Sequence, residues 1–287
     1  MIETHRGIVG SSQCDANRHM NVSAYVQRFS EAGQNLFAMH GAGGIWYRPA
    51  NRHFRFHREL EENARTLVLS VQIGAGEFDG QILHVMQDAD RGFISATCMD
   101  SEFSALPSGL AGTQGGPPAK AKPRSIEAGR YVPADSAALL ENRLAMVAHR
   151  NRVGADECGG DGCMNDGDLV GRFFASASQL WAFAGFSMKW FADNGYGGAA
   201  VEMKLTLHEP IRVGQDYAIH SWVPHMSSKM LPLSNQLVSV PDARPLASIS
   251  ANSIVMDHAT RMAVDIPEEF RRKHANRFGE LKEMAAF

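Results

Sequence analysis

Residues 14–25 read Cys-Asp-Ala-Asn-Arg-His-Met-Asn-Val-Ser-Ala-Tyr, and this stretch decides how the rest of the chain is interpreted. Four polar side chains of three chemical kinds fall within seven residues: Asp15, Asn17, His19 and Asn21. From about residue 22 to residue 40, apolar residues recur at a spacing near 3.6, which predicts a helix. Asn21 or Ser23 could cap that helix. The stretch therefore predicts a polar loop that ends at a helix N-terminus.

This combination of groups suits the hydrolysis of an acyl thioester. The carbonyl oxygen gains negative charge in the transition state, and first-turn N–H groups, here those of Val22 and Ser23, can stabilise it. The carboxylate of Asp15 can activate water or attack the carbonyl itself. The imidazole and the two amides can orient the water and the carboxylate. A lone Asp or His before a helix is more often part of a plain polar turn, so the inference rests on the combination.

Outward from this stretch, each half of the chain shows the same order of elements. In the first half, a short extended run precedes the loop, and alternating or β-rich runs follow the helix. The expected strands lie at about 4–10, 51–59, 65–74, 80–88 and 91–103. In the second half, a strand near 142–153 and a loop at 154–168 precede an apolar helix, 169–193. Further strands are expected at 199–208, 214–223, 229–240 and 245–257, and a polar helical tail begins at Glu268.

Residues 104–125 separate these halves. The segment is rich in Gly, Pro, Ala and Lys, so we expect a linker that neither buries a core nor sustains a periodic element. The expected organisation is an N-terminal unit at 1–103 with the intact motif, the linker, and a C-terminal unit at 126–287. The order strand, loop, central helix and antiparallel strands, occurring twice, is that of an α+β hot-dog fold, although other α+β domains share it.

Five motif positions carry a resemblance to a known family: Asp15, Asn17, His19, Asn21 and Tyr25. Their spacing, Asp-x-Asn-x-His-hydrophobic-Asn-x-x-x-Tyr, resembles the signature of acyl-acyl-carrier-protein thioesterases. It is also similar to the Asp-x-x-Gly-His-x-Asn loop of the 4-hydroxybenzoyl-CoA thioesterase group. A second stretch, 54–60, resembles the Glu-Tyr-Arg-Arg-Glu-Cys strand of the carrier-protein enzymes, in which the acid or the thiol has a catalytic part. Glu59 matches that acid, and Leu60 replaces the thiol.

The resemblance implies two tandem hot-dog units, each a curved antiparallel sheet wrapped round a long central helix, packed as an intrachain pseudo-dimer. It assigns catalysis to the motif side chains and Glu59, and the oxyanion to the backbone of Val22 and Ser23. The acyl group would lie between the units, and the resemblance makes four aromatic residues candidates for binding it: Tyr25, Trp46, Tyr47 and Trp181. Five arginines could face carrier phosphates: Arg18, Arg48, Arg52, Arg55 and Arg58. In plant-type enzymes the full signature lies in the C-terminal unit, so the identity of the acyl carrier stays open.

The corresponding loop of the second half, 153–165, lacks part of the motif. Met164-Asn165 lines up with Met20-Asn21, but Cys163 stands where His19 stands. We therefore expect a degenerate copy and one functional site per chain. Cys158 and Cys163 lack convincing partner ligands, so we expect no zinc site, and the chemistry needs no other metal or cofactor.

Composition limits the kinds of partner that we expect for this protein. The net charge of −3 and the pI near 6.5 do not favour nucleic acid. Residues 1–10 lack the apolar core of an export signal, and Arg172 and Lys189 interrupt the most apolar segment, so a cytoplasmic protein without a membrane partner is expected. The expected partner is an acyl-CoA or acyl-carrier-protein substrate, and a homodimer is compatible with the family.

Two other functions stay open. One is a hot-dog enoyl-CoA hydratase, whose motif is Gly-Asp-x-Asn-Pro-x-His. Here no Pro follows Asn17, and His19 comes one residue early. The other is a non-catalytic unit that binds acyl-CoA. Release of free thiol from an acyl-CoA would distinguish a thioesterase from both.

Overall fold

The computed structural model describes residues 1–15, 17–110, 112–113 and 115–278. Contacts between residues group the chain into two compact units. The first unit comprises Met1–Gly129 together with Glu157–Gly171, and the second comprises Arg130–Asp156 with Arg172–Phe287. The loop of the second half therefore makes its main contacts in the first unit.

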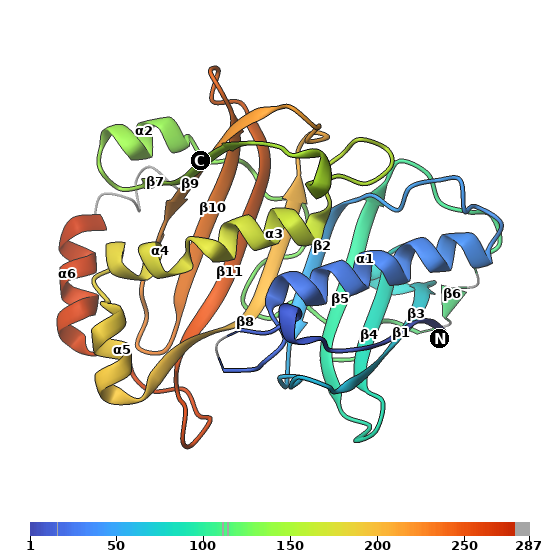
Figure 1. Cartoon of the computed structure of the whole chain (residues 1–287), viewed down its shortest axis with the longest axis horizontal. Coiled ribbons are helices and arrows are strands. Elements are labelled where there is room, and N and C mark those ends of the chain that lie inside the picture. The colour runs from blue at the N-terminus through green and yellow to red at the C-terminus, as the bar shows by residue number, and fades with distance from the viewer. Residues whose placement is uncertain (16, 111, 114, 279–287) are drawn as a thin grey trace. The chain divides into compact units, whose positions relative to one another are not determined.

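The first unit is an antiparallel sheet with one long helix across it (Figure 1). The strand order is β1-β3-β4-β5-β2, and the short β6 pairs in parallel with β3. The elements are β1 (Ile2–Ile8), α1 (Val22–Met39), β2 (Pro49–Phe56), β3 (Arg65–Ile73), β4 (Ile82–Asp88), β5 (Ile94–Phe103) and β6 (Gly112–Thr113). Short 3-10 turns lie at Ser11–Gln13 and Gly76–Phe78.

Helix α1 forms because its apolar side chains recur on one face, which is buried against the sheet. Phe29 on this face packs on Phe54 of β2, with ring centroids 6.1 Å apart. Near the other end, Gly33 leaves room for the ring of Tyr47, which a Cβ atom at position 33 would approach within clashing distance. The helix ends at His40, and Gly41 follows with φ +74°, a conformation that glycine adopts at little cost.

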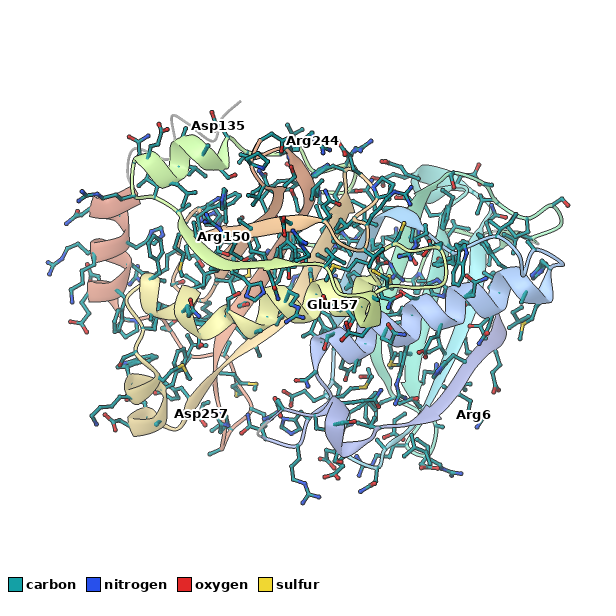
Figure 2. The ribbon with its side chains drawn as sticks, turned by 45° about the horizontal axis from the view of Figure 1, so that its top comes forward. Arg6, Asp135, Arg150, Glu157, Arg244 and Asp257 are labelled. Carbon is teal, nitrogen blue, oxygen red and sulfur yellow. The ribbon has the colours of Figure 1, made fainter. Side chains whose placement is uncertain are left out.

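The second unit repeats this sheet topology, with strand order β7-β9-β10-β11-β8. Its strands are β7 (Met146–Arg152), β8 (Tyr196–Leu207), β9 (Asp216–Trp222), β10 (Leu231–Ser239) and β11 (Pro245–Asp257). Its helices are α2 (Ser136–Glu141), α3 (Asp166–Ala175), α4 (Ala177–Phe183), α5 (Met188–Asn194) and α6 (Glu268–Phe278), and a 3-10 turn lies at Ala155–Glu157. Asp135 caps α2 by accepting a hydrogen bond from the N–H of Ala138 (Figure 2).

The expected single helix at 169–193 is wrong, because the segment forms α3, α4 and α5 in succession. Ser176 stands at the first break, where its hydroxyl donates to the carbonyls of Arg172 and Phe173 and competes with the helical pattern. Gly185 follows α4 with φ +104°, and Ser187 starts α5 by accepting a hydrogen bond from the N–H of Trp190. Apolar composition did not predict the two breaks, and it overestimated burial, since Met188 in α5 is 58% exposed.

The segment expected to be a featureless linker also differs from the prediction. Gly112–Thr113 forms β6, and Ala121 is 1% exposed in an apolar cluster with residues of the first sheet. That cluster contains Ile73, Phe78, Leu83, Val85 and Met99. Alanine is small enough to pack closely on the sheet, so a Gly- and Pro-rich segment here covers part of the sheet face. No helix in the described part of the chain has the length and apolar character needed to cross a membrane.

Candidate active site

The first loop, residues 11–21, is folded by its own backbone. The N–H of Asp15 donates to the carbonyl of His19 at 2.8 Å, and the backbones of Cys14 and Met20 form an isolated β-bridge. The carboxylate of Asp15 turns back on the loop, where Oδ1 accepts from the N–H groups of Asn17 (2.8 Å) and His19 (2.9 Å). The Asp15 side chain is exposed within the first unit. One carboxylate oxygen thus fixes the loop, and the described residues record no partner for Oδ2.

His19 and Glu59 come together from different elements. The chain that follows β2 runs antiparallel to the loop, with the N–H of Met20 donating to the carbonyl of Leu60 at 2.8 Å. This pairing places Nδ1 of His19 3.6 Å from Oε2 of Glu59. Glu59 therefore lies beside the motif loop, although it is 40 positions after His19 in the sequence, and its catalytic role stays a prediction.

The N-terminus of α1 is open. Asn21 occupies the N-cap position, but its side chain makes no capping hydrogen bond. The carbonyl of Asn21 accepts from Ala24 and Tyr25, while the described residues offer no recorded acceptor for the N–H groups of Val22 and Ser23. Two unsatisfied donors at the positive end of an 18-residue helix form a favourable place for developing negative charge. Asn17 is exposed, and none of the described residues forms a hydrogen bond with its side chain.

Tyr25 is 4% exposed, so in this structure it is a buried link rather than part of an exposed wall. Its hydroxyl lies 3.0 Å from Oγ of Ser95 and accepts the N–H of Leu60 at 3.1 Å. Ser95 in turn donates to the carbonyl of Arg58 at 2.6 Å. These bonds fasten the segment that carries Glu59 to the first turn of α1.

The other aromatic candidates occupy different environments. Trp46 is 48% exposed, and its ring lies against Gly160 of the second loop. Tyr47 is buried, and both hydrogen-bonding partners of its hydroxyl are internal. Trp181 lies in the aromatic core of the second unit, where its indole occupies the space that Gly198 leaves without a side chain. Their assignment to the acyl group stays a prediction.

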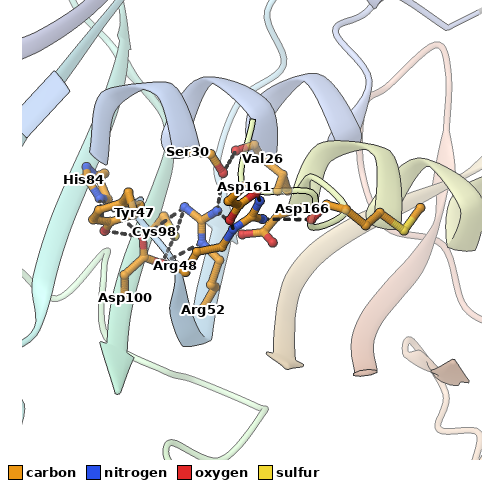
Figure 3. Close-up of polar contacts among 11 residues, drawn as sticks. Val26, Ser30, Tyr47, Arg48, Arg52, His84, Cys98, Asp100, Asp161 and Asp166 are labelled. Carbon is orange, nitrogen blue, oxygen red and sulfur yellow. Dashed lines mark hydrogen bonds and ion pairs between the residues drawn. The ribbon is translucent and has the colours of Figure 1, made fainter. Parts of the chain in front are cut away.

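A buried polar network in the first unit was not predicted from the sequence (Figure 3). Arg52 is 0% exposed and binds both carboxylate oxygens of Asp100 at 2.9 Å. It also donates to Oδ2 of Asp166 at 2.8 Å. The hydroxyl of Tyr47 donates to Asp100 at 2.7 Å and lies 2.9 Å from Nε2 of His84. Alternation of polar and apolar residues on β2 could not reveal these partners, because they come from four separate parts of the chain.

The charges in this network follow from its burial. Burial lowers the pKa of His84, although Asp100 opposes that shift, so the imidazole is neutral at pH 7. Burial alone would raise the pKa of Asp100, but Arg52 and His84 outweigh it and hold that pKa below its usual range. Burial and the nearby Asp100 raise the pKa of Tyr47 well above normal. The network therefore contains Arg52 paired with the carboxylates of Asp100 and Asp166, beside a neutral imidazole and a neutral phenol.

Three of the arginines expected to face phosphates are committed elsewhere. Arg18 pairs with Glu62, and Arg52 belongs to the buried network. Arg48 binds both carboxylate oxygens of Asp161 in the second loop and donates to two carbonyls of that loop. Arg55 and Arg58 remain as candidates to face a phosphate. The guanidinium of Arg58 lies over the ring of Phe93, 4.2 Å from its centroid.

The second loop has the backbone of the first. The backbones of Cys158 and Met164 form a β-bridge, as those of Cys14 and Met20 do. The N–H of Gly159 donates to the carbonyl of Cys163, as the N–H of Asp15 does to that of His19. The N–H of Asn165 donates to Glu157 as that of Asn21 does to Gln13. In equal positions, then, Gly159 replaces Asp15 and Cys163 replaces His19, so the second loop retains the conformation without the acid and the imidazole. The described residues include no cluster of His, Cys, Asp and Glu suited to a metal ion.

Comparison with known proteins identifies the class of fold first. Three solved structures resemble nearly the whole chain: a putative oleoyl thioesterase from Lactobacillus plantarum, an acyl-ACP thioesterase from Bacteroides thetaiotaomicron and the 12:0-ACP thioesterase from Umbellularia californica. Their TM-scores are 0.60, 0.60 and 0.57 at 11%, 7% and 12% identity. They cover 87%, 88% and 88% of this chain and 93%, 96% and 93% of their own. The fold is thus a pair of tandem hot-dog units.

The family follows from the sequence itself. The profile of the thioesterase-like superfamily matches residues 9–103 and again residues 159–274, once in each half. The chain belongs to the thioesterase-like superfamily. A search of curated proteins gives no match.

Proposed function

We propose that the protein hydrolyses an acyl thioester, carried by CoA or by an acyl-carrier protein, to the free acid and the thiol. The observation that carries this proposal is the loop before an uncapped helix N-terminus, in which Asp15 binds the backbone N–H of His19 and the His19 imidazole lies 3.6 Å from Glu59. Membership of the thioesterase-like superfamily and the likeness to acyl thioesterases in fold agree with it.

In the proposed reaction, Asp15 is the general base. Its Oδ1 is held by two N–H groups, which leaves Oδ2 to take a proton from water. The water attacks the thioester carbonyl, and the N–H groups of Val22 and Ser23 stabilise the oxyanion. Collapse of the intermediate breaks the C–S bond. The leaving thiolate takes the proton that Asp15 received from water, which gives the free thiol.

Supporting groups orient these partners. His19, whose Nδ1 lies 3.6 Å from Oε2 of Glu59, positions the water and the acid, and Asn17 belongs to the same loop. Asn21 ends the loop and leaves the helix donors free because its side chain does not cap them. Binding of the acyl group by Tyr25, Trp46, Tyr47 or Trp181 would have to respect the burial described above, which favours Trp46 as the side chain most open to a ligand.

The test is release of free thiol from a panel of acyl-CoAs and acyl-carrier proteins, measured with Ellman's reagent. For Asp15→Asn we expect kcat to fall by at least about 100-fold with the fold intact, because the base is lost while the size is kept. The kcat of Glu59→Gln should fall less, since Glu59 acts through His19. Asp156→Asn is the matched control, because Asp156 is an exposed acid in the 3-10 turn of the second loop.

Three results would reject the mechanism or the function. An unchanged rate in Asp15→Asn would exclude Asp15 as the base. Binding of acyl-CoA without thiol release by any substrate would favour a non-catalytic binding protein. Addition of water to crotonyl-CoA without thiol release would favour a hydratase.

A further inference from the structure

Three side chains on one face of the first sheet bury polar atoms without partners. These atoms are Nε of Arg55, Nε2 of His57 and Oγ1 of Thr97, and the described residues offer none of them a hydrogen bond. Thr97 is 1% exposed. A buried polar atom without a hydrogen bond destabilises the fold, so three such atoms on one face indicate a missing ligand.

The register of the sheet shows that these side chains are neighbours. Arg55 of β2 is paired directly with Thr97 of β5, so their side chains project from the same face. The opposite face of β2 carries Phe54 and Phe56, whose rings contact α1. Arg55 and Thr97 therefore point away from α1, on the face opposite the buried Arg52 network. His57 follows Arg55 by two residues, and its N–H donates to the carbonyl of Ser95 at 2.8 Å.

Residues 120–122, in the segment expected to be a linker, lie over this cluster. The carbonyl of Lys122 accepts from Nη1 of Arg55 at 2.7 Å, and Ala121 packs against Met99, two residues beyond Thr97. Lys120 is exposed in the same segment. Burial, with smaller contributions from the positive charges of Arg55 and Lys120, lowers the pKa of His57 to about 4.

We propose that Arg55, His57, Thr97 and Lys120 form a binding site for a phosphate group. The Nε–H of Arg55 can only donate, so the ligand must present an acceptor. Arg55 is a cation with an unpaired, buried Nε–H and lies beside the unpaired hydroxyl of Thr97, which favours an anion over a water molecule. A tetrahedral phosphate can accept from the guanidinium, the imidazole N–H, the hydroxyl and the ammonium group together.

Two sources could supply this phosphate, namely free inorganic phosphate and the phosphates of CoA or of a phosphopantetheine arm. The second source rests on the proposed function. Binding is therefore measured separately from hydrolysis, by calorimetry and by thermal shift with inorganic phosphate, CoA, dephospho-CoA and pantetheine. Failure of binding would leave the thiol-release test untouched, and the reverse also holds.

Two variants test the site. Thr97→Val keeps the shape and removes only the hydroxyl, so it should fold normally and weaken phosphate binding about tenfold, as expected for a hydrogen bond to a charged group. Arg55→Gln removes the charge and should weaken binding by more. Arg65→Gln is the matched control, because Arg65 on β3 is exposed and already paired with Asp90. It should bind phosphate like the wild type.

The outcomes separate the two sources. Weaker binding of dephospho-CoA than of CoA, with a raised KM and unchanged kcat for acyl-CoA in Thr97→Val, would assign the site to the carrier. Binding of inorganic phosphate with no change in KM would support a site for the free anion. Absence of binding by phosphate and CoA at millimolar concentration, or equal binding by wild type and both variants, would overturn the proposal.

Discussion

At the scale of single residues, the hydroxyl of Tyr25 connects α1 to the segment that carries Glu59. We expect Tyr25→Phe to cost about 1–3 kcal/mol in the free energy of unfolding, because the buried N–H of Leu60 loses its acceptor. We also expect kcat to fall about tenfold with a smaller change in KM, since Glu59 would no longer be fixed relative to the helix. Urea unfolding and thiol-release kinetics measure the two effects.

A second tyrosine provides the control for that variant. The Tyr131 hydroxyl in the second unit bonds to Ser234 and Ser250, so Tyr131→Phe removes a partly buried hydroxyl outside the candidate site. It should lose stability without loss of kcat. Equal losses of kcat in the two variants would mean that Tyr25 has only a structural role.

The residue scale also shows what the sequence could predict. Asp15 and His19 are predicted to lie together because they are four residues apart in one loop, and the carboxylate of Asp15 accepts the backbone N–H of His19. Glu59 lies 3.6 Å from the His19 ring, a position that the resemblance to a known strand indicated and the local spacing did not. Their catalytic roles stay predictions. Arg52 is one of the five arginines that could face a phosphate, and in the structure it is buried against Asp100 on the neighbouring strand, a pairing that no local sequence pattern reports.

At the scale of elements, the Arg52 network joins β2, β5 and the start of α3. We expect Arg52→Met to destabilise the protein by about 3–5 kcal/mol, because Asp100 and Asp166 would be left buried without their cation. Arg65→Gln breaks an exposed, solvent-screened ion pair and should cost far less stability than Arg52→Met. Urea unfolding gives both values, and similar losses in the two variants would contradict a role for burial.

Strands were easier to predict than the interruptions of the second central helix. Alternation and turn residues located every strand except the two-residue β6 to within a few residues, because the period of a half-buried strand is set by the pleat. The breaks at Ser176 and Gly185 depend on hydrogen bonds and on a backbone angle that apolar periodicity does not report. The hydrogen bond between Arg52 in the first half of the sequence and Asp166 in the second half was likewise not predicted.

At the scale of the whole molecule, the repeat was the most predictable feature. Both halves have one strand order, and the two loops share one hydrogen-bond pattern, so a duplicated pattern in the sequence corresponds to a duplicated fold. The grouping of Glu157–Gly171 with the first unit was not predictable in this way. It depends on Arg48 and Arg52 binding acids that have no counterpart in the first loop.

Histidines in both units predict how stability changes with pH. Burial lowers the pKa of His57 and of His208 to about 4, and positive neighbours add to the shift in each case. The unfolded chain binds protons to these histidines near pH 6.5, whereas the folded chain does not. Their contribution is therefore fully present above pH 6.5 and is lost as the pH falls toward 4.

We expect a loss of about 1 kcal/mol per histidine between pH 7 and pH 5, less than the full shift would give because both rings are partly exposed. The double variant His57→Gln/His208→Gln cannot take up these protons, so its stability should fall less over the same range. Urea unfolding of wild type and variant at several pH values, in a buffer without phosphate, measures the difference. Because the buried His84 and His220 also have lowered pKa values, the variant should keep a residual slope of the same sign. Parallel curves for the two proteins would show that His57 and His208 do not control the acid limit.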